Sequence, residues 1–513
     1  MSRFNLIDEK WIPVRFLDGT RDELGIHDTL HRSREISFIE DPSPLVVASL
    51  HRFLLAVLYR ALEGPTDIDQ AKDLFNSGLP DERIADYLER WRGRFWLFDE
   101  EYPFFQIPDY EPKEKGGKKL WRSWAAIAAE HNADHAMVLF DHLDIRRAGS
   151  IAANKAIRWL IACQTFALGG GRSDFKYTKS GPSATSVMAF PLGKNLQDTL
   201  LFSLVPENRE IVKTDTPVWE RKPDSLETLK KGMKRPALGW ADLYTWRTRS
   251  VKFNPQGNDA SISELTFASG IECSMEGYVD PMLGYWIDEE KGKLPVQFRD
   301  RGLWRDFDSL LPDESRLAPL VIEHTTILAR KDRRRFPKSV IVLGQANNKA
   351  KIKYWRMERF SLPEALRADR FIRTEIHQLL SDAEEAQSAL LLACRTFARQ
   401  LLSRGGPEPA AKDVRNFVEQ MSANGWYWSV MESHFHEILR DYGLDRDADD
   451  IRRQWLESVR DALRGAWEQH SASVAMGDAW AIRALVKAEK PVRDKLKELS
   501  NEIMKLEPNK EVA

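Results

Sequence analysis

The sequence predicts an α+β protein in which an irregular mixed α/β N-terminal domain, residues 1–365, precedes a C-terminal antiparallel four-helix bundle, residues 366–513. Up to about residue 360, short β-rich segments alternate with apolar helical runs and are separated by Pro and Gly. Beyond residue 366, apolar residues recur every three to four positions in four long segments. A chain of 513 residues also exceeds one ordinary hydrophobic core, so more than one domain is expected.

Composition and charge restrict the classes of function. The formal net charge is −2, so any nucleic-acid surface has to be a local patch. The three cysteines, Cys163, Cys273 and Cys394, lie far apart without C-x-x-C spacing and predict neither disulfides nor a thiolate zinc site. The N-terminus lacks a signal-peptide pattern, and no apolar run reaches the roughly 18 residues that span a bilayer. We therefore expect a soluble, cytoplasmic protein without a membrane partner.

The N-terminal half contains two buried helices in this prediction. Apolar crowding over residues 45–59 predicts the first, which begins after two prolines and ends near a Gly-Pro pair. The charged, glycine-bearing stretch 113–119 predicts a mobile loop, and a helix is expected from 121 to 136. The second buried helix, over 152–168, leads directly into three consecutive glycines.

The C-terminal half predicts four helices, over 366–403, 411–440, 447–472 and 478–506. Each carries its apolar residues along one stripe, which is the pattern of core packing between neighbouring helices. No repeat of 20 to 50 residues is present, so a solenoid is not expected.

The three glycines, Gly169, Gly170 and Gly171, are the most informative motif. They match neither the Walker A pattern nor G-x-G-x-x-G, so no nucleotide cofactor is expected. One interpretation is a helix C-cap that continues into a turn. The other is a backbone that lies close to a phosphate or a base edge. Basic and aromatic residues directly downstream favour the second: Arg172, Phe175, Lys176, Tyr177 and Lys179.

The stretch 331–356 is the most basic in the chain, with nine Lys or Arg residues and a single acid, Asp332. Its pattern predicts a β-hairpin with a tip at 344–349. On the second strand Lys351 and Lys353 alternate with apolar residues, which gives one basic face. A charged, solvated edge hairpin is the alternative to a nucleic-acid contact. We favour a hairpin that enters a nucleic-acid groove.

A histidine-rich segment offers a different chemistry. His131, Asp134, His135 and His142 supply imidazole and carboxylate groups that a metal-dependent nuclease would use. His131 and His135 would share one face of a helix. The segment lacks H-E-x-x-H, however, so this nuclease is kept as the alternative function.

Several motifs, taken in one order, resemble a known family. They are the opening 4–14, the aromatic segments 95–98 and 103–106, the three glycines, and 347–350. The chain resembles the CasA family, the large subunit of the type I-E CRISPR Cascade complex, from its first residues into the helical half. The resemblance implies the same two-domain fold and no catalytic centre, and the absence of both nucleotide-binding motifs leads us to expect no cofactor.

The family's function, as the resemblance implies it, is recognition of the protospacer-adjacent motif (PAM) in double-stranded target DNA, followed by opening of the duplex for pairing with guide RNA. The backbone of Gly169–Gly171 would meet the minor groove beside the PAM. A wedge would separate the first base pairs, and basic residues would hold the phosphates. By resemblance the wedge would be Asn347, Asn348, Lys349 and Ala350, and we expect supporting phosphate contacts from Arg172, Lys176, Lys179, Lys351 and Lys353.

The resemblance also implies further contacts and partners. A loop that includes Phe140, Asp141 and His142 would contact DNA or the guide end of the complex. Expected partners are the backbone, small and guide-end subunits and the helicase-nuclease of the system. Some family members carry glutamine where Lys349 stands, so either Lys349 or Asn348 could be the wedging group. Certain members bind zinc through paired cysteines that this chain lacks, and we expect no metal.

Overall fold

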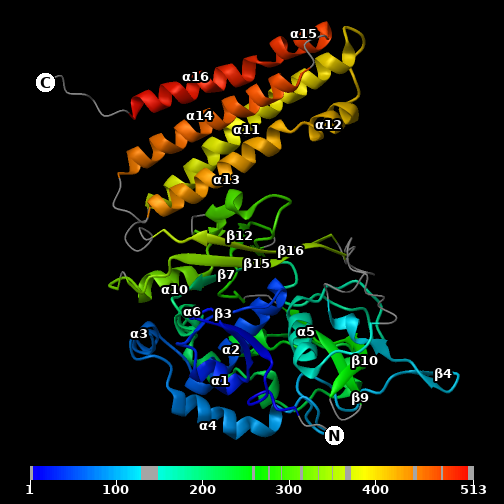
Figure 1. Ribbon diagram of the computed structural model, residues 1–513. Coiled ribbons are helices and arrows are strands. Elements are labelled where there is room, and N and C mark those ends of the chain that lie inside the picture. The colour runs from blue at the N-terminus through cyan, green and yellow to red at the C-terminus, as the bar shows by residue number, and fades with distance from the viewer. Residues whose placement is uncertain are drawn as a thin grey trace. The chain divides into compact units, whose positions relative to one another are not determined.

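The computed structural model describes residues 4–128, 148–256, 260–274, 278–290, 292–311, 316–332, 334–348, 351–363, 371–442, 447–474 and 478–506 (Figure 1). The chain divides into two compact units. Unit 1 contains residues 1–303 and 309–359, and unit 2 contains 304–308 and 360–513. Helices and several small sheets occur together, so the predicted α+β class is confirmed.

Unit 1 is built around helix α2 (Pro44–Leu62), in which all residues except Arg60 are buried. Pro44 occupies the first turn, where its missing N–H costs nothing, and the Ser43 hydroxyl accepts from the N–H of Val46. This helix is long and apolar enough to cross a membrane, contrary to the expectation that no run reaches that length. Because 94% of the apolar window is buried inside the protein, α2 is a core helix.

Shorter helices surround α2, and α5 and α9 pack directly against it. Besides α2, the described part of unit 1 has the α-helices α1 (Ile26–His31), α3 (Ile68–Ser77), α4 (Asp81–Trp91), α5 (Ala153–Phe166), α6 (Leu196–Ser203), α7 (Arg209–Thr214), α8 (Leu226–Lys231), α9 (Trp240–Tyr244) and α10 (Leu320–Leu328). Its 3-10 helices include η1 (Arg92–Arg94), η2 (Trp124–Ile127) and η5 (Val218–Glu220). The predicted buried helices over 45–59 and 152–168 are both confirmed, as α2 and α5.

The strands of unit 1 form small sheets of two or three strands, in the orders β2-β1-β3, β6-β10-β9, β11-β8, β13-β12-β14, β16-β15-β7 and β4-β5. Their bounds are β1 (Ile12–Phe16), β2 (Arg21–Leu24), β3 (Ile36–Ile39), β4 (Glu114–Lys115), β5 (Lys118–Lys119), β6 (Arg122–Ser123), β7 (Val187–Leu192), β8 (Lys234–Pro236), β9 (Arg249–Gln256), β10 (Ser261–Ser269), β11 (Glu272–Ser274), β12 (Tyr285–Asp288), β13 (Gly292–Pro295), β14 (Arg316–Leu317), β15 (Ser339–Asn348) and β16 (Lys351–Ser361). Only β8 and β11 pair in parallel among the ladders whose register is described.

Two local predictions are wrong. The stretch 113–119 is a small hairpin, β4 and β5, whose turn residues Gly116 and Gly117 have φ of +60° and +74°. Positive φ at both central positions is what a two-residue hairpin turn requires, and glycine adopts it without strain. The helix predicted over 121–136 is replaced up to residue 128 by β6 and η2, and its remainder lies outside the described residues.

The basic stretch forms a longer hairpin than predicted. Strands β15 and β16 are hydrogen-bonded neighbours separated by two residues, and β15 pairs antiparallel with β7 on its other edge. Residues 344–348, predicted as part of the tip, belong to β15. Gly344 has φ of +158°, and a Cβ there would lie 2.1 Å from the carbonyl oxygen of Ser186, which directly precedes β7. The close packing of β15 against this segment therefore requires glycine.

The described part of unit 2 contains six α-helices where the sequence predicts four: α11 (Phe371–Ser403), α12 (Ala411–Glu419), α13 (Ala423–Asp441), α14 (Ala448–Ser473), α15 (Ala479–Ala488) and α16 (Lys490–Lys505). The predicted helices over 411–440 and 478–506 are each broken once. Helix α11 packs against α13, α14, α15 and α16, and α14 packs against α13 and α16.

A short segment from within the predicted N-terminal domain, 304–308, belongs to unit 2. It lies within the 3-10 stretch η6 (Leu303–Leu310). The Trp304 ring lies 5.5 Å from that of Trp428 and 5.2 Å from that of Phe435. The guanidinium of Arg305 stacks 3.6 Å over Trp428 and donates to both carboxylate oxygens of Glu384 at 2.9 Å. Unit 2 is therefore not a contiguous stretch of sequence.

Candidate nucleic-acid interface

The loop after α5, residues 168–180, folds back on itself and holds the three glycines in one conformation. The N–H of Gly169 donates to Ser180 Oγ at 3.0 Å, and the N–H of Gly170 donates to the Thr178 carbonyl at 3.0 Å. The N–H of Gly171 donates to Thr178 Oγ1 at 3.1 Å. All three amides therefore have partners inside the loop. The helix-cap interpretation describes only the start of the loop, because the chain then continues into an ordered hairpin-like turn.

Gly169 and Gly170 need to be glycine for different reasons. A Cβ on Gly169 would lie 2.7 Å from the backbone nitrogen of Ser180, so the return strand of the loop excludes any side chain. Gly170 has φ of +118°, a conformation that L-residues rarely adopt. Gly170 and Gly171 are exposed and present bare backbone at the surface.

Arg249 of β9 closes the base of the loop. Its guanidinium donates to the Leu168 carbonyl at 2.6 Å and to the Lys179 carbonyl at 2.7 Å, so one side chain holds both ends of the loop. Arg249 is 2% exposed, and burial lowers its pKa. The backbone of Arg249 is held in turn by Gln164 of α5, whose side-chain amide makes hydrogen bonds of 2.8 and 2.9 Å with it. The loop is thus preorganised by the helix before it and a strand distant in sequence.

Gln345 joins the basic hairpin to the same loop region. Its Nε2 donates to the carbonyls of Phe166, which ends α5, and Ala184, which follows the loop, at 2.7 and 2.6 Å. Gln345 is fully buried on β15, three residues before Asn348. The structure therefore brings together the two elements that the sequence predicts to act on one ligand.

A cavity of about 180 Å³ lies between these elements. Gly169, Gly171 and Arg172 line it from the loop, and Ile352 lines it from β16. Cys163 also lines it, and burial raises the pKa of this thiol to about 11, so the sulfur stays protonated and is no nucleophile at neutral pH.

The predicted phosphate-contacting residues are all exposed: Arg172, Lys176, Lys179, Lys351 and Lys353. Lys179 forms an ion pair of 3.4 Å with Glu272, and for the other four no ion pair exists among the described residues. On β16, Lys351 and Lys353 are exposed while Ile352 between them is half-buried, which confirms the predicted alternation. Tyr177 is 66% exposed, whereas Phe175 packs 4.7 Å from the ring of Tyr110 as a structural anchor.

Part of the predicted basic patch serves the fold instead. Arg335 donates to the Phe75 carbonyl at 2.5 Å, pairs with Asp198 at 2.9 Å and stacks 3.5 Å over the Phe75 ring. Arg356 is half-buried over the ring of Tyr354. These two arginines are therefore not part of an exposed basic surface. The sequence had counted all nine basic residues of 331–356 together, and this expectation is corrected for Arg335 and Arg356.

Several predicted residues lie outside the described part of the chain. They are His131, Asp134, His135, Phe140, Asp141, His142, Lys349 and Ala350. Asn347 is half-buried and Asn348 exposed at the end of β15. Among the described residues no group of three or more His, Cys, Asp or Glu side chains is placed to hold a metal ion. The histidine-rich segment is not among the residues searched.

The sequence did not point to Arg249 and Gln345, which hold the borders of the glycine loop. Each lies in a strand that carries other polar residues as well, and the local sequence does not distinguish the buried polar side chain from the others. Only the spatial approach of α5, β9 and β15 supplies the carbonyl partners that make these side chains structural.

Comparison with known proteins places this geometry in context. The family described as CRISPR-associated protein Cse1 matches residues 5–466. The chain is 31% identical to the CRISPR-associated protein CasA/Cse1 of Thermus thermophilus, over 98% of this chain and 99% of that protein.

Solved structures show the same fold. The structure of Thermus thermophilus CasA (Cse1) is similar with a TM-score of 0.84 at 29% identity, over 97% of this chain and 100% of that one. A chain of a CRISPR RNA-guided surveillance complex has a TM-score of 0.72 at 20% identity, over 96% of this chain and 100% of that one. The likeness extends through both units.

Proposed function

The chain belongs to the family of CRISPR-associated protein Cse1, and from this premise we propose that it is the non-catalytic large subunit of a type I-E surveillance complex that recognises the PAM in duplex DNA. In this proposal the subunit reads the PAM and opens the first base pairs, and guide RNA reads the remaining sequence. The observation that carries the proposal is the preorganised, exposed glycine loop, joined through Gln345 to the basic hairpin.

The glycine loop suits a groove because its backbone is bare and already ordered. Gly170 and Gly171 allow a close approach that side chains would prevent, and little conformational entropy is lost on binding. Since the amides of all three glycines are occupied within the loop, contact in the minor groove would come from the shape of the backbone and from the flanking cations. Minor-groove edges are degenerate, so such a reader would tolerate several PAM sequences.

The hairpin end suits strand separation because it is braced. Opening a base step costs a few kcal/mol, and the inserted wedge has to resist that load. The two hydrogen bonds from Gln345 tie β15 to the rest of unit 1 just before the proposed wedge, Asn347–Ala350. The exposed Lys351 and Lys353 then lie where they could hold the phosphates of the opened strand.

The proposal includes partners beyond DNA. They are guide RNA, the backbone, small and guide-end subunits of the complex, and the helicase-nuclease that it recruits. The loop containing Phe140, Asp141 and His142 would contribute to DNA or guide contact. We also propose that the helices of unit 2 act as one antiparallel four-helix bundle, in which α12 with α13 and α15 with α16 each serve as one interrupted helix.

The test uses the assembled complex with wild-type chain, Gly170→Asp, Asn348→Ala and Lys349→Ala, and duplexes with or without the PAM. Lys213→Ala, on exposed α7, is the matched control. We expect Gly170→Asp to weaken PAM-dependent binding at least about tenfold, which is about 1.4 kcal/mol. The wedge variants should bind but open the duplex less, as measured by fluorescence of 2-aminopurine beside the PAM.

Equal binding and opening by every variant would overturn the proposal. A parallel assay incubates the isolated chain with DNA and divalent metal. Cleavage that disappears in His135→Ala would instead establish the alternative, a metal-dependent nuclease using His131, Asp134, His135 and His142.

A further inference from the structure

A second cavity, of about 200 Å³, borders the glycine loop. Lys176, Tyr177 and Lys179 line it from the loop. The segment Lys231–Lys234, which joins α8 to β8, lines it from another side, and Glu272 at the start of β11 lines it beside residues 248 and 269–271. Neither Lys231 nor Lys234 drew attention in the sequence.

The lining carries a local excess of positive charge. Four lysines face a single carboxylate, that of Glu272. Its oxygens lie 3.4 Å from Lys179 Nζ and 3.9 Å from Lys234 Nζ, so one carboxylate is shared between two ammonium groups at the long end of ion-pair distances. Lys231 pairs with Glu227 at 2.5 Å, but both are more than 70% exposed, and such pairs contribute little. The lining residues therefore carry a net charge of +3, which falls to +2 when Glu227 is counted.

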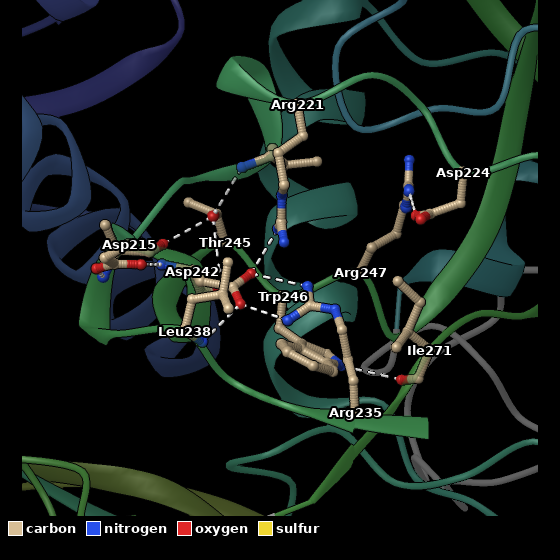
Figure 2. Close-up of polar contacts among 12 residues, drawn as sticks. Asp215, Arg221, Asp224, Arg235, Leu238, Asp242, Thr245, Trp246, Arg247 and Ile271 are labelled. Atoms are coloured by element: carbon tan, nitrogen blue, oxygen red, sulfur yellow. Dashed lines mark hydrogen bonds and ion pairs between the residues drawn. The ribbon is translucent and has the colours of Figure 1, made fainter. Parts of the chain in front are cut away.

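The lysine-bearing segment is fixed by a buried network, drawn in Figure 2. Asp242 is fully buried and accepts from Arg235 at 2.5 and 3.0 Å and from Arg221 at 2.5 Å. The Arg235 guanidinium also stacks 4.1 Å over the ring of Trp246. Arg235 directly follows Lys234, so these contacts hold the cationic segment in place at one wall of the cavity.

The two walls also touch. Gly232 has φ of +83°, and a Cβ there would lie 3.0 Å from Cδ of Lys176. The side chain of Lys176, an exposed residue, therefore lies along bare backbone of the opposite segment, and its Nζ would be 3.5 Å from that Cβ. The cavity is a built feature of the fold, with cations from segments far apart in sequence.

We propose that this cavity binds backbone phosphates of the target duplex, with Lys231 and Lys234 as contacts that do not depend on the PAM sequence. The inference rests on the proposed function, because it extends the DNA surface from the glycine loop. Ammonium groups bind phosphates as point charges without reading sequence. Glu272 would limit this attraction, since it neutralises part of the charge on Lys179 and Lys234.

The test measures the dissociation constant of the assembled complex against salt concentration, for duplexes with and without the PAM. We expect the double substitution Lys231→Ala with Lys234→Ala to weaken both duplexes by the same factor, about tenfold, and to reduce the log–log salt slope by about 1–2. Lys213→Ala is the control, since Lys213 is likewise an exposed lysine paired with a neighbouring glutamate, Glu210.

Glu272→Gln tests whether binding of both duplexes becomes tighter when the lining loses a negative charge. Removing the shared carboxylate should tighten both duplexes several-fold, a gain that misfolding cannot produce. Unchanged affinity in Glu272→Gln together with unchanged affinity in the double variant overturns the inference.

The remaining outcomes separate this inference from the proposed function. A wild-type complex without PAM preference overturns the proposed function. With PAM preference intact, a loss confined to the PAM duplex overturns the inference, because it shows base reading. A double variant that fails to incorporate guide RNA or another subunit also overturns it, since the cavity then serves assembly.

Discussion

At the scale of single residues, buried polar side chains decide where the bare backbone of the interface lies. Arg249 and Gln345 each donate to two carbonyls at the borders of the glycine loop. Leaving such acceptors without donors costs about 1–3 kcal/mol. The geometry of the loop therefore depends on two side chains that are themselves buried.

Substitution of Arg249 is the direct test of this dependence. We expect Arg249→Leu to lower the free energy of unfolding by about 2–4 kcal/mol, because the carbonyls of Leu168 and Lys179 lose their donor. Urea unfolding monitored by tryptophan fluorescence measures it. Arg172→Leu, which removes an exposed arginine of the same loop, should leave the urea concentration at the unfolding midpoint unchanged. Equal effects of the two substitutions would contradict the role given to Arg249.

Glu207 shows how burial makes one carboxyl sensitive to pH. Burial, with the nearby Asp215, raises its pKa from the ordinary 4.5 to about 8. Its Oε1 accepts from the N–H of Trp240 at 3.1 Å and from the hydroxyl of Tyr278 at 3.0 Å. Between about pH 4.5 and about pH 8, the Glu207 carboxyl therefore stays protonated in the folded protein but is ionised in the unfolded chain. This contribution to stability is therefore complete below about pH 4.5 and is lost as the pH rises towards 8.

We expect Glu207→Gln to remove that pH dependence. The amide is neutral throughout, so the variant should gain stability relative to wild type between about pH 5 and about pH 8. Unfolding in urea at both pH values measures the difference. Glu210→Gln is the control, because a hydrogen bond from Lys213 lowers rather than raises the pKa of Glu210. A constant difference between Glu207→Gln and wild type would refute the prediction.

At the scale of elements, the sequence predicted the helices and strands that have strong periodicity. It missed a helix break and a small hairpin, which depend on one or two proline or glycine residues. The buried helices α2 and α5 were found because their apolar patterns are long, and the basic hairpin was found because Lys351 and Lys353 alternate with apolar residues. The break between α15 and α16 was overlooked. Pro491 signals this break, because a proline inside a continuous helix would disrupt that helix. The small hairpin at 113–119 was likewise signalled by two adjacent glycines.

The glycine loop allows a matched pair of substitutions. Gly169→Ala places a Cβ 2.7 Å from backbone that cannot move aside, whereas the nearest atom to a Cβ on Gly171 is Thr178 Oγ1 at 3.8 Å. We expect Gly169→Ala to raise the rate of tryptic cleavage after Lys176 and Lys179 at least about fivefold, because a loss of about 1 kcal/mol opens the loop that much more often. Gly171→Ala should be cleaved at the wild-type rate. Equal rates in the two variants would show that the loop is not held as described.

At the scale of the whole molecule, the two units are not successive in sequence. The predicted boundary at 365 lies close to the change of unit after residue 359, but 304–308 also belongs to unit 2. Sequence could not show this, because Trp304 is separated from Trp428 by more than a hundred residues and nothing local distinguishes it from the other tryptophans of the chain.

Trp304→Ala tests the membership of that segment. The ring is 2% exposed against Trp428 and Phe435, so its removal should cost about 3–5 kcal/mol. We expect hydrogen exchange to rise in α13 while protection in α2 is retained. Trp286→Ala, a half-buried tryptophan on β12 of unit 1, serves as the control and should leave α13 unchanged. A uniform rise across both units would contradict the assignment.

The side chain of Gln345 has an evolutionary consequence. Because one amide spans the carbonyls of Phe166 and Ala184, the loop between them cannot change length or register without moving the end of β15. Substitutions at position 345 should therefore covary with insertions and deletions between 166 and 184 across relatives. The chain would then diversify by exchanging side chains on an invariant backbone frame, and the spacing between the glycine loop and the end of β15 would be the slowest-changing property of this surface.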